Sequence, residues 1–147
     1  MYKKILVPLD GSKRAERILP HVEELASHFD SEVVFLRITE SAAGVLGAHV
    51  DTPGMYLEAL NSLRQDAKAY LTALNGEYRN RGMKTRTILE EGPVVSKIIQ
   101  IARNEEVDLI AMASHGRTGI RQVFYGSVAA GVLNQVDRPL LLIRSAD

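Results

Sequence analysis

Five short apolar runs alternate with longer stretches of helical period, and this alternation limits the possible folds of the chain more than any other feature. The runs are mostly continuously apolar, as is typical of strands that helices cover on both faces. Strands joined by helices in this way lie parallel and are connected by right-handed crossovers. The chain is therefore expected to form an α/β fold, a three-layer sandwich with helices on both faces of a parallel sheet. The predicted strands are Lys4–Leu9, Glu32–Ile38, Thr85–Leu89, Val107–Met112 and Leu140–Arg144, and the predicted helices are about Ser12–His28, Met55–Arg81, Val94–Asn104 and Ser127–Val136.

Length and composition exclude several classes of protein. The 147 residues suit one domain, residues 1–147, with no linker or internal repeat. Lysine plus arginine (18) balances aspartate plus glutamate (18), so no net field attracts nucleic acid or an anionic membrane. There is no cysteine, which excludes disulfides and cysteine-ligated metal. No apolar run approaches the roughly 18 residues of a membrane helix, and residues Met1–Ile5 lack the apolar core of a signal peptide, so a cytoplasmic location is expected.

A glycine-bearing segment follows the fourth predicted strand and leads into the last helix. It reads Ala113-Ser114-His115-Gly116-Arg117-Thr118-Gly119 and continues further on with Gly126-Ser127-Val128. Glycines at such a junction bare backbone N–H groups where the helix dipole is positive, which favours phosphate. Glycines near both ends also let the loop close around a polyphosphate without obstruction by side chains. The segment therefore predicts a nucleotide site, with ATP as the expected ligand.

Each candidate residue also has a purely structural explanation. Asp10, at the carboxyl end of the first strand, either accepts hydrogen bonds from ribose hydroxyls or forms a turn with Ser12 as the helix N-cap. Gly126-Ser127 is either part of a phosphate cradle or an ordinary N-cap pair. His115 and Arg117 either reach a phosphate or lie in solvent. The sequence leaves these alternatives open.

Other known fingerprints are missing. There is no G-x-x-x-x-G-K-[ST], so the chain is not a P-loop NTPase. No G-x-G-x-x-G follows the first strand, which counts against dinucleotide binding. The four histidines show no metal-ligand spacing, so no protein metal site is predicted.

One connection, Ser41–Gly54, is unusually long for a compact domain. It carries three glycines and a proline and shows no sustained period. Such connections are often binding loops, and equally often surface connections with no further role.

Several stretches make the chain resemble a known family. It opens with K-K-I-L-V-P-L-D-G-S (Lys3–Ser12), continues with E-G-P (Glu91–Pro93), and ends with V-D-L-I-A-M-A-S-H-G-R-T-G, G-S-V-A and R-P-L-L-L-I-R (Arg138–Arg144). Together these stretches resemble the single-domain universal stress protein family over essentially the whole chain. The resemblance implies the adenine nucleotide alpha hydrolase-like fold, with a five-stranded parallel sheet of order 3-2-1-4-5. It also implies a ligand site at the switch between strands 1 and 4.

The ATP-binding branch of that family carries the motif G-x2-G-x9-G-[ST]. Here the pattern reads Ala113-x2-Gly116-x9-Gly126-Ser127, so alanine replaces the first glycine. By resemblance, the glycines and Ser127 hold the phosphates of ATP, with any magnesium or manganese bound through those phosphates, and Asp10 meets the ribose. The full set of predicted cofactor-binding residues is Pro8, Leu9, Asp10, Ile38, Met112, Ala113, His115, Gly116, Arg117, Gly119, Gly126, Ser127 and Val128.

Binding ATP does not require hydrolysing it. Hydrolysis needs a positioned water, a base and cations on the γ-phosphate, and the sequence offers no convincing base, so no catalytic residue is predicted. The expected function is a nucleotide-dependent stress-response switch or interaction protein with at most slow ATP hydrolysis. The alternative is a dimeric, stress-related protein-interaction module with a vestigial nucleotide site.

The last predicted strand points to a homodimer. The family commonly dimerises through this strand, and in the implied strand order Leu140–Arg144 lies at a sheet edge. An apolar edge with unpaired backbone groups invites a partner strand. A twofold homodimer that pairs these edges is therefore expected.

Overall fold

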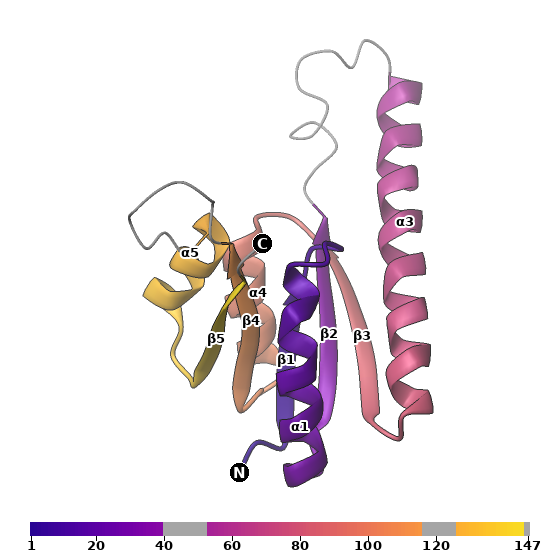
Figure 1. Cartoon of the computed structure of the whole chain (residues 1–147). Helices are drawn as coiled ribbons and strands as arrows, with labels where there is room; N and C mark the ends of the chain where they lie inside the picture. The colour runs from indigo at the N-terminus through magenta and orange to yellow at the C-terminus, as the bar shows by residue number, and fades with distance from the viewer. Residues whose placement is uncertain (40–52, 116–125, 146–147) are drawn as a thin grey trace.

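Five parallel strands form a single sheet at the centre of the molecule (Figure 1). The computed structural model describes residues 1–39, 53–115 and 126–145. The strands are β1 (Lys4–Leu9), β2 (Glu32–Thr39), β3 (Lys84–Glu91), β4 (Leu109–His115) and β5 (Leu140–Ser145). The helices are a 3₁₀ helix, η1 (Ala15–Ile18), and α1 (Leu19–Phe29), α3 (Pro53–Asn80), α4 (Val94–Asn104) and α5 (Ser127–Gln135). The strand order is β3-β2-β1-β4-β5 with every pair parallel, which confirms the predicted fold and order.

Helices cover both faces of the sheet, as predicted. The helices η1, α1 and α3 lie on one face, and α4 and α5 lie on the other (Figure 1). Successive side chains of a strand point to opposite faces, so Phe35 of β2 packs towards α3, with its ring centroid 5.7 Å from that of Tyr78. Its neighbour Leu36 joins the other core cluster, with Ile98 of α4. Phe35, Leu36 and Ile98 are fully buried, and each such side chain contributes about 1.5–3 kcal/mol to stability.

The first helix begins later than predicted. The sequence predicted one helix over Ser12–His28, whereas the structure has a turn, then η1, and only from Leu19 an α-helix. Local hydrogen bonds explain the turn, because Asp10 Oδ1 accepts from the backbone N–H of Ser12 at 2.9 Å. Pro20 then stands in the first turn of α1, where its missing N–H costs nothing.

Two other boundaries differ for local reasons. The fourth strand was predicted from Val107, but the N–H of Val107 donates to the carbonyl of Ala102 at 3.1 Å and so closes the end of α4. Helix α3 begins at Pro53, so the last two residues of the predicted connection Ser41–Gly54 are helical. The rest of that connection lies outside the described residues.

Helix α3 extends well beyond the carboxyl ends of the strands (Figure 1). Its buried residues begin only at Ala67, while Met55 and Leu57 are 55% and 56% exposed. Arg64 ties the helix to the sheet, because its Nη2 lies 2.8 Å from Glu91 Oε2 at the end of β3. No described helix is long and apolar enough to cross a membrane; the cytoplasmic location stays a prediction.

Substitution of Gly131 tests the packing between α4 and α5, and substitution of Gly76 in α3 is the control. A Cβ on Gly131 of α5 would stand 2.7 Å from Val95 Cγ2, and a valine in a helix has little freedom to rotate away. We expect Gly131→Ala to lower the free energy of unfolding by about 1–3 kcal/mol. Gly76→Ala in α3 meets nothing within 4 Å and should raise it by up to about 1 kcal/mol. Urea denaturation measures both, and equal effects would contradict this close packing.

Candidate functional site

A cavity lies at the carboxyl ends of β1, β2 and β4, where the chain changes the direction in which it adds strands. From β1 the chain adds β2 and β3 on one side, then crosses over to add β4 and β5 on the other. Such a switch point leaves a crevice outside the strand ends, where ligands of open α/β sheets bind. The cavity has a volume of about 380 Å³, within the range of small-molecule sites. Its described lining is Pro8, Leu9, Asp10, Ala15, Leu36, Arg37, Ile38, Thr39, Leu63, Val94, Ile98, Met112 and Val128.

The fold brings together six residues that the sequence predicted for the ligand site. They come from the ends of three strands and from the first turn of α5, which are far apart in the chain. These six are Pro8, Leu9, Asp10, Ile38, Met112 and Val128. Most of the lining is apolar, so the cavity offers an apolar surface to a flat organic group, and its polar lining residues are Asp10, Arg37 and Thr39.

A short chain of hydrogen bonds holds Asp10 in the cavity wall. Its Oδ1 accepts from the backbone N–H of Ser12 at 2.9 Å and from the Ser12 hydroxyl at 2.5 Å. The Ser12 Oγ in turn accepts from the N–H of Ala15 at 3.2 Å, at the start of η1. Gly11 between them has φ +86°, a conformation that favours glycine. Asp10 is therefore a turn residue and a wall of the cavity at once.

The two central residues of β4 lie on opposite faces of the sheet. Met112 is buried among the residues that α4 and α5 cover, and it lines the cavity. Ala113 packs instead against the cluster beneath η1 and α1, and it is not among the described lining residues. The strict alternation of side chains along a strand forces this separation.

The amino end of α5 faces the cavity through Val128. Gly126 is the N-cap residue, with φ −49° and ψ 156°, and no described side chain caps the first turn. The first N–H groups of a helix have no partner within the helix and lie at the positive end of its dipole. The arrangement around Gly126 and Ser127 is therefore suited to an anion.

Four predicted residues cannot be located in this arrangement. Gly116, Arg117 and Gly119 lie outside the described residues. His115 ends β4 in register with Ser145 of β5, but its side chain also lies outside the described part of the chain.

Sequence comparison assigns the chain to a family. The model of the universal stress protein family matches residues 1–144. The chain belongs to this family. Its sequence is 31% identical to universal stress protein MJ0577 of Methanocaldococcus jannaschii over 98% of this chain and 96% of that protein.

Solved universal stress proteins share the fold. The structure of MJ0577 superposes with a TM-score of 0.85, covering 100% of this chain and 99% of the other at 31% identity. A universal stress protein in complex with cAMP has a TM-score of 0.62 at 15% identity and covers 99% of this chain and 98% of its own. A family protein from Arabidopsis thaliana with AMP bound has a TM-score of 0.62 at 16% identity and covers 98% and 92%.

Sequence reasoning missed several residues that line the cavity of this universal stress protein. Leu63 comes from α3 and Val94 from the first turn of α4, and only the three-dimensional fold brings them to the strand ends. Arg37 had a visible signal, because it is the one charged residue within the apolar run Val33–Ile38. It is also the one cation among the described lining residues.

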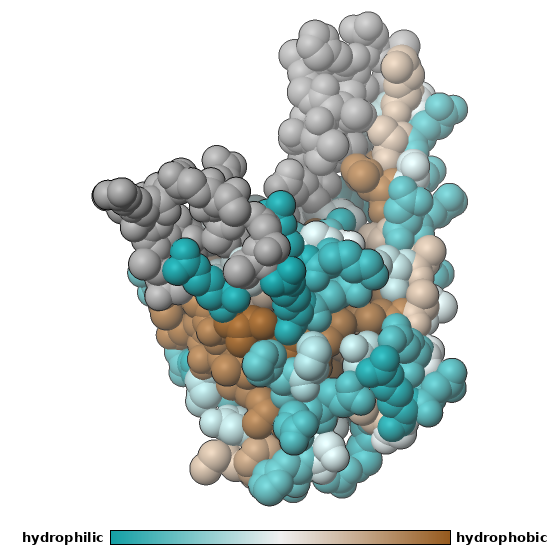
Figure 2. All heavy atoms as spheres, in the orientation of Figure 1, coloured by the Kyte–Doolittle hydropathy of each residue, from teal (hydrophilic) through white to brown (hydrophobic). Residues whose placement is uncertain are grey.

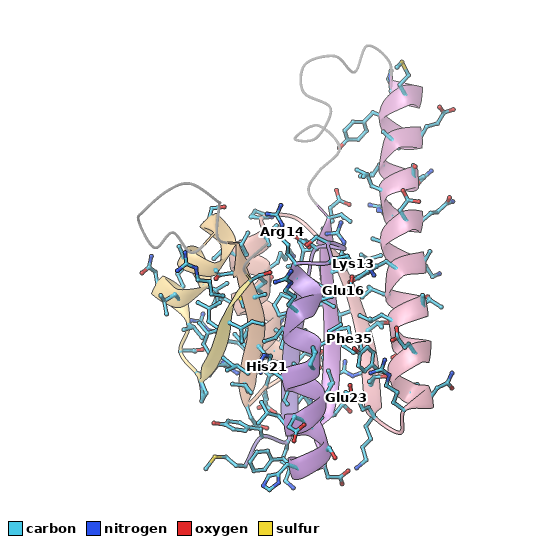
Figure 3. The ribbon with its side chains drawn as sticks, viewed as in Figure 1. Lys13, Arg14, Glu16, His21, Glu23 and Phe35 are labelled. Atoms are coloured by element: carbon cyan, nitrogen blue, oxygen red, sulfur yellow. The ribbon has the colours of Figure 1, made fainter. Side chains whose placement is uncertain are left out.

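Charged groups act on the buried hydroxyl of Tyr70 on α3, and two of them, Asp10 and Arg37, also line the cavity. Burial raises the pKa of the Tyr70 phenol well above its ordinary value, and the carboxylates of Glu16 and then Asp10 raise it further. Arg37 acts on the same hydroxyl in the opposite direction. Figure 3 shows Glu16 at the start of the first helical segment, with Lys13 and Arg14 beside it. Two carboxylates and a guanidinium thus lie within electrostatic reach of one phenol.

The described residues contain no group of three or more histidine, aspartate or glutamate side chains that could hold a metal ion.

Proposed function

We propose that this universal stress protein binds an adenine nucleotide, ATP in particular, in the cavity between the ends of β1 and β4. One observation carries the proposal: a mostly apolar cavity is lined by Asp10 and by Val128 at the amino end of α5, where no described side chain caps the helix. Base, ribose and phosphate would each find a chemically matched surface there. The two universal stress proteins solved with AMP and with cAMP support the nucleotide class.

Each part of the nucleotide has proposed contacts. The base would lie against the apolar side chains of Ile38 and Met112, together with Pro8 and Leu9, and the ribose hydroxyls would donate to Asp10. The phosphates would accept from backbone N–H groups at the start of α5, and charge-assisted bonds of this kind contribute about 1.5–3 kcal/mol each. The remaining proposed phosphate contacts are Ala113, His115, Gly116, Arg117, Gly119, Gly126, Ser127 and Val128.

Any hydrolysis is expected to be slow. Magnesium or manganese would enter with the triphosphate, bound through its oxygens rather than by a protein site. Rapid hydrolysis also requires a base that positions water at the γ-phosphate. Asp10, the carboxylate in the cavity wall, is assigned to the ribose in this proposal and not to a water at the γ-phosphate. The proposed role is therefore binding.

Calorimetric titration with ATP and magnesium tests the site. We expect micromolar binding to the wild type and loss of at least tenfold in affinity in Gly126→Val, because a branched side chain at the N-cap obstructs the approach of phosphate to the first N–H groups. Gly54→Val, in the open first turn of α3, is the matched control and should bind normally. Binding that Gly126→Val leaves unchanged would contradict the proposed position of the phosphates.

We further propose that the nucleotide acts as a switch, by ordering the segment from Gly116 to Gly126 and the connection from Ser41 and thereby changing the surface offered to a partner. A near-complete shift requires the ligand to prefer one state about 10⁴-fold. Hydrogen exchange measured with and without ATP should show increased protection in both segments. Unchanged protection, under conditions where calorimetry shows saturation, would leave a nucleotide binder that is not a switch.

The edge of the sheet favours the proposed homodimer. The N–H of Ile110 in β4 donates to the carbonyl of Pro139 at 3.0 Å, so the backbone groups of residue 139 face β4. Because these groups alternate along a strand, those of Leu140 and Leu142 face outward. Figure 2 shows hydrophobic residues gathered over β4 and β5, where Leu141 and Ile143 are only partly buried. A dimer with a vestigial nucleotide site is the alternative function, and loss of ATP binding without loss of the dimer would favour it.

Two substitutions of Leu142 distinguish a dimer formed by backbone pairing of the edge strands from one formed by side-chain packing. Leu142→Pro removes an outward N–H that β4 does not use, and proline is tolerated at such edge positions. We expect Leu142→Pro to be monomeric by analytical ultracentrifugation, while Leu142→Ala, which loses the same side chain but keeps the N–H, remains dimeric. Two dimeric variants would argue against pairing through this edge.

A further inference from the structure

Ile38, near the end of β2, is one of the residues that line the cavity, and the direction of its carbonyl follows from the hydrogen bonds of its neighbour. The neighbouring carbonyl, that of Thr39, accepts from the N–H of Gly92 at 3.0 Å and therefore faces β3. Carbonyls alternate in direction along a strand, so that of Ile38 faces the β1 side. There the ladder has already ended, because the last pair of β1 and β2 is Leu9 with Arg37. Ile38 thus offers an acceptor at the cavity wall that the sheet does not use.

Arg37 occupies this acceptor. Its Nη1 donates to the carbonyl of Ile38 at 3.0 Å, and Arg37 is one of the residues that line the cavity. A Cβ on Gly11 would lie 3.9 Å from Arg37 Nε, so the guanidinium reaches across to the turn after β1. The carboxylates of Asp10 and Glu16 act on the same Tyr70 hydroxyl as Arg37 does.

The guanidinium changes what this part of the wall offers to a base. A bare carbonyl accepts, and so matches the 6-amino group of adenine. A guanidinium only donates, and so matches an oxygen at the same position. An adenine amine would have to share the carbonyl with Arg37, beside a positive charge that repels a donor, whereas a 6-oxopurine would accept from Arg37 directly.

We propose that Arg37 is a specificity-determining residue that weakens the preference of this site for adenine over 6-oxopurine nucleotides. The proposal rests on the nucleotide site proposed above. Without the Arg37 side chain, the backbone carbonyl of Ile38 would favour adenine. With it, the guanidinium donor favours a 6-oxopurine.

Titrations with ATP and with inosine triphosphate test the proposal, since the two nucleotides differ only in the 6-substituent and the adjoining ring proton. We expect Arg37→Met to bind inosine triphosphate more weakly and ATP at least as tightly, so that the preference for ATP rises about tenfold. Arg37→Lys keeps the charge but not the planar fork and should fall between. A purely structural role would weaken both nucleotides equally.

Arg81→Met is the matched control. Arg81 lies after α3, at the opposite end of the sheet, where its guanidinium is paired with Glu23 and Glu77, each at 2.9 Å. The Arg81→Met substitution removes the same charge as Arg37→Met and should leave the preference for ATP over inosine triphosphate unchanged. Thermal melting monitors folding, and if Arg37→Met is not native, the comparison of Arg37→Lys with the wild type replaces it.

The outcomes separate this inference from the proposed function. If the wild type binds both nucleotides and loses both in Gly126→Val, but the preference is the same in the Arg37 variants, the site stands and the role of Arg37 is overturned. If the wild type and Arg37→Met bind neither nucleotide, the proposed function fails and the inference fails with it.

Discussion

The central position of β1 is the constraint on which the rest of the structure depends. Its residues Ile5, Leu6 and Val7 are completely buried, so the strand must be paired on both sides and covered on both faces. Right-handed crossovers meet this requirement only if the chain builds outward in one direction and then in the other. The reversal places one pair of α-helices on each face, and it separates the connections that leave β1 and β4. The cavity is the space that this separation leaves.

Much of the fold was predictable because it follows from the pattern of apolar residues. Strands buried on both faces and helices with an apolar stripe differ in period, so the elements and the layered architecture followed from this pattern. The strand order was expected only from the resemblance to the family. Element boundaries depended on single hydrogen bonds, such as that between Asp10 and Ser12, which the period does not reveal. The sequence predicted continuous helix there because the residues themselves are compatible with it.

The candidate site was predictable to a different extent at each residue. Positions at strand ends, such as Asp10 and Met112, could be assigned because parallel strands share one edge. Ala113 was assigned from the family motif, and it lies on the opposite face of β4 from Met112, so Met112 lines the cavity while the contact proposed for Ala113 stays a prediction. Leu63 could not be found, since nothing local relates a position in α3 to the ends of the strands. Arg37 could have been questioned, because a cation within a buried strand requires compensation.

Helix α3 combines two regions of different stability. From Ala67 onward it is held by buried side chains and opens only with the core. The preceding half, about 20 Å of helix, has no buried residue, and isolated helices of that length are marginal in water. The bond between Arg64 and Glu91 lies near the boundary, beside the cavity residue Leu63. The part of the cavity wall formed by α3 therefore lies at the boundary between the buried half of the helix and the half that can fray independently. Local melting of the exposed half would widen the cavity without unfolding the protein.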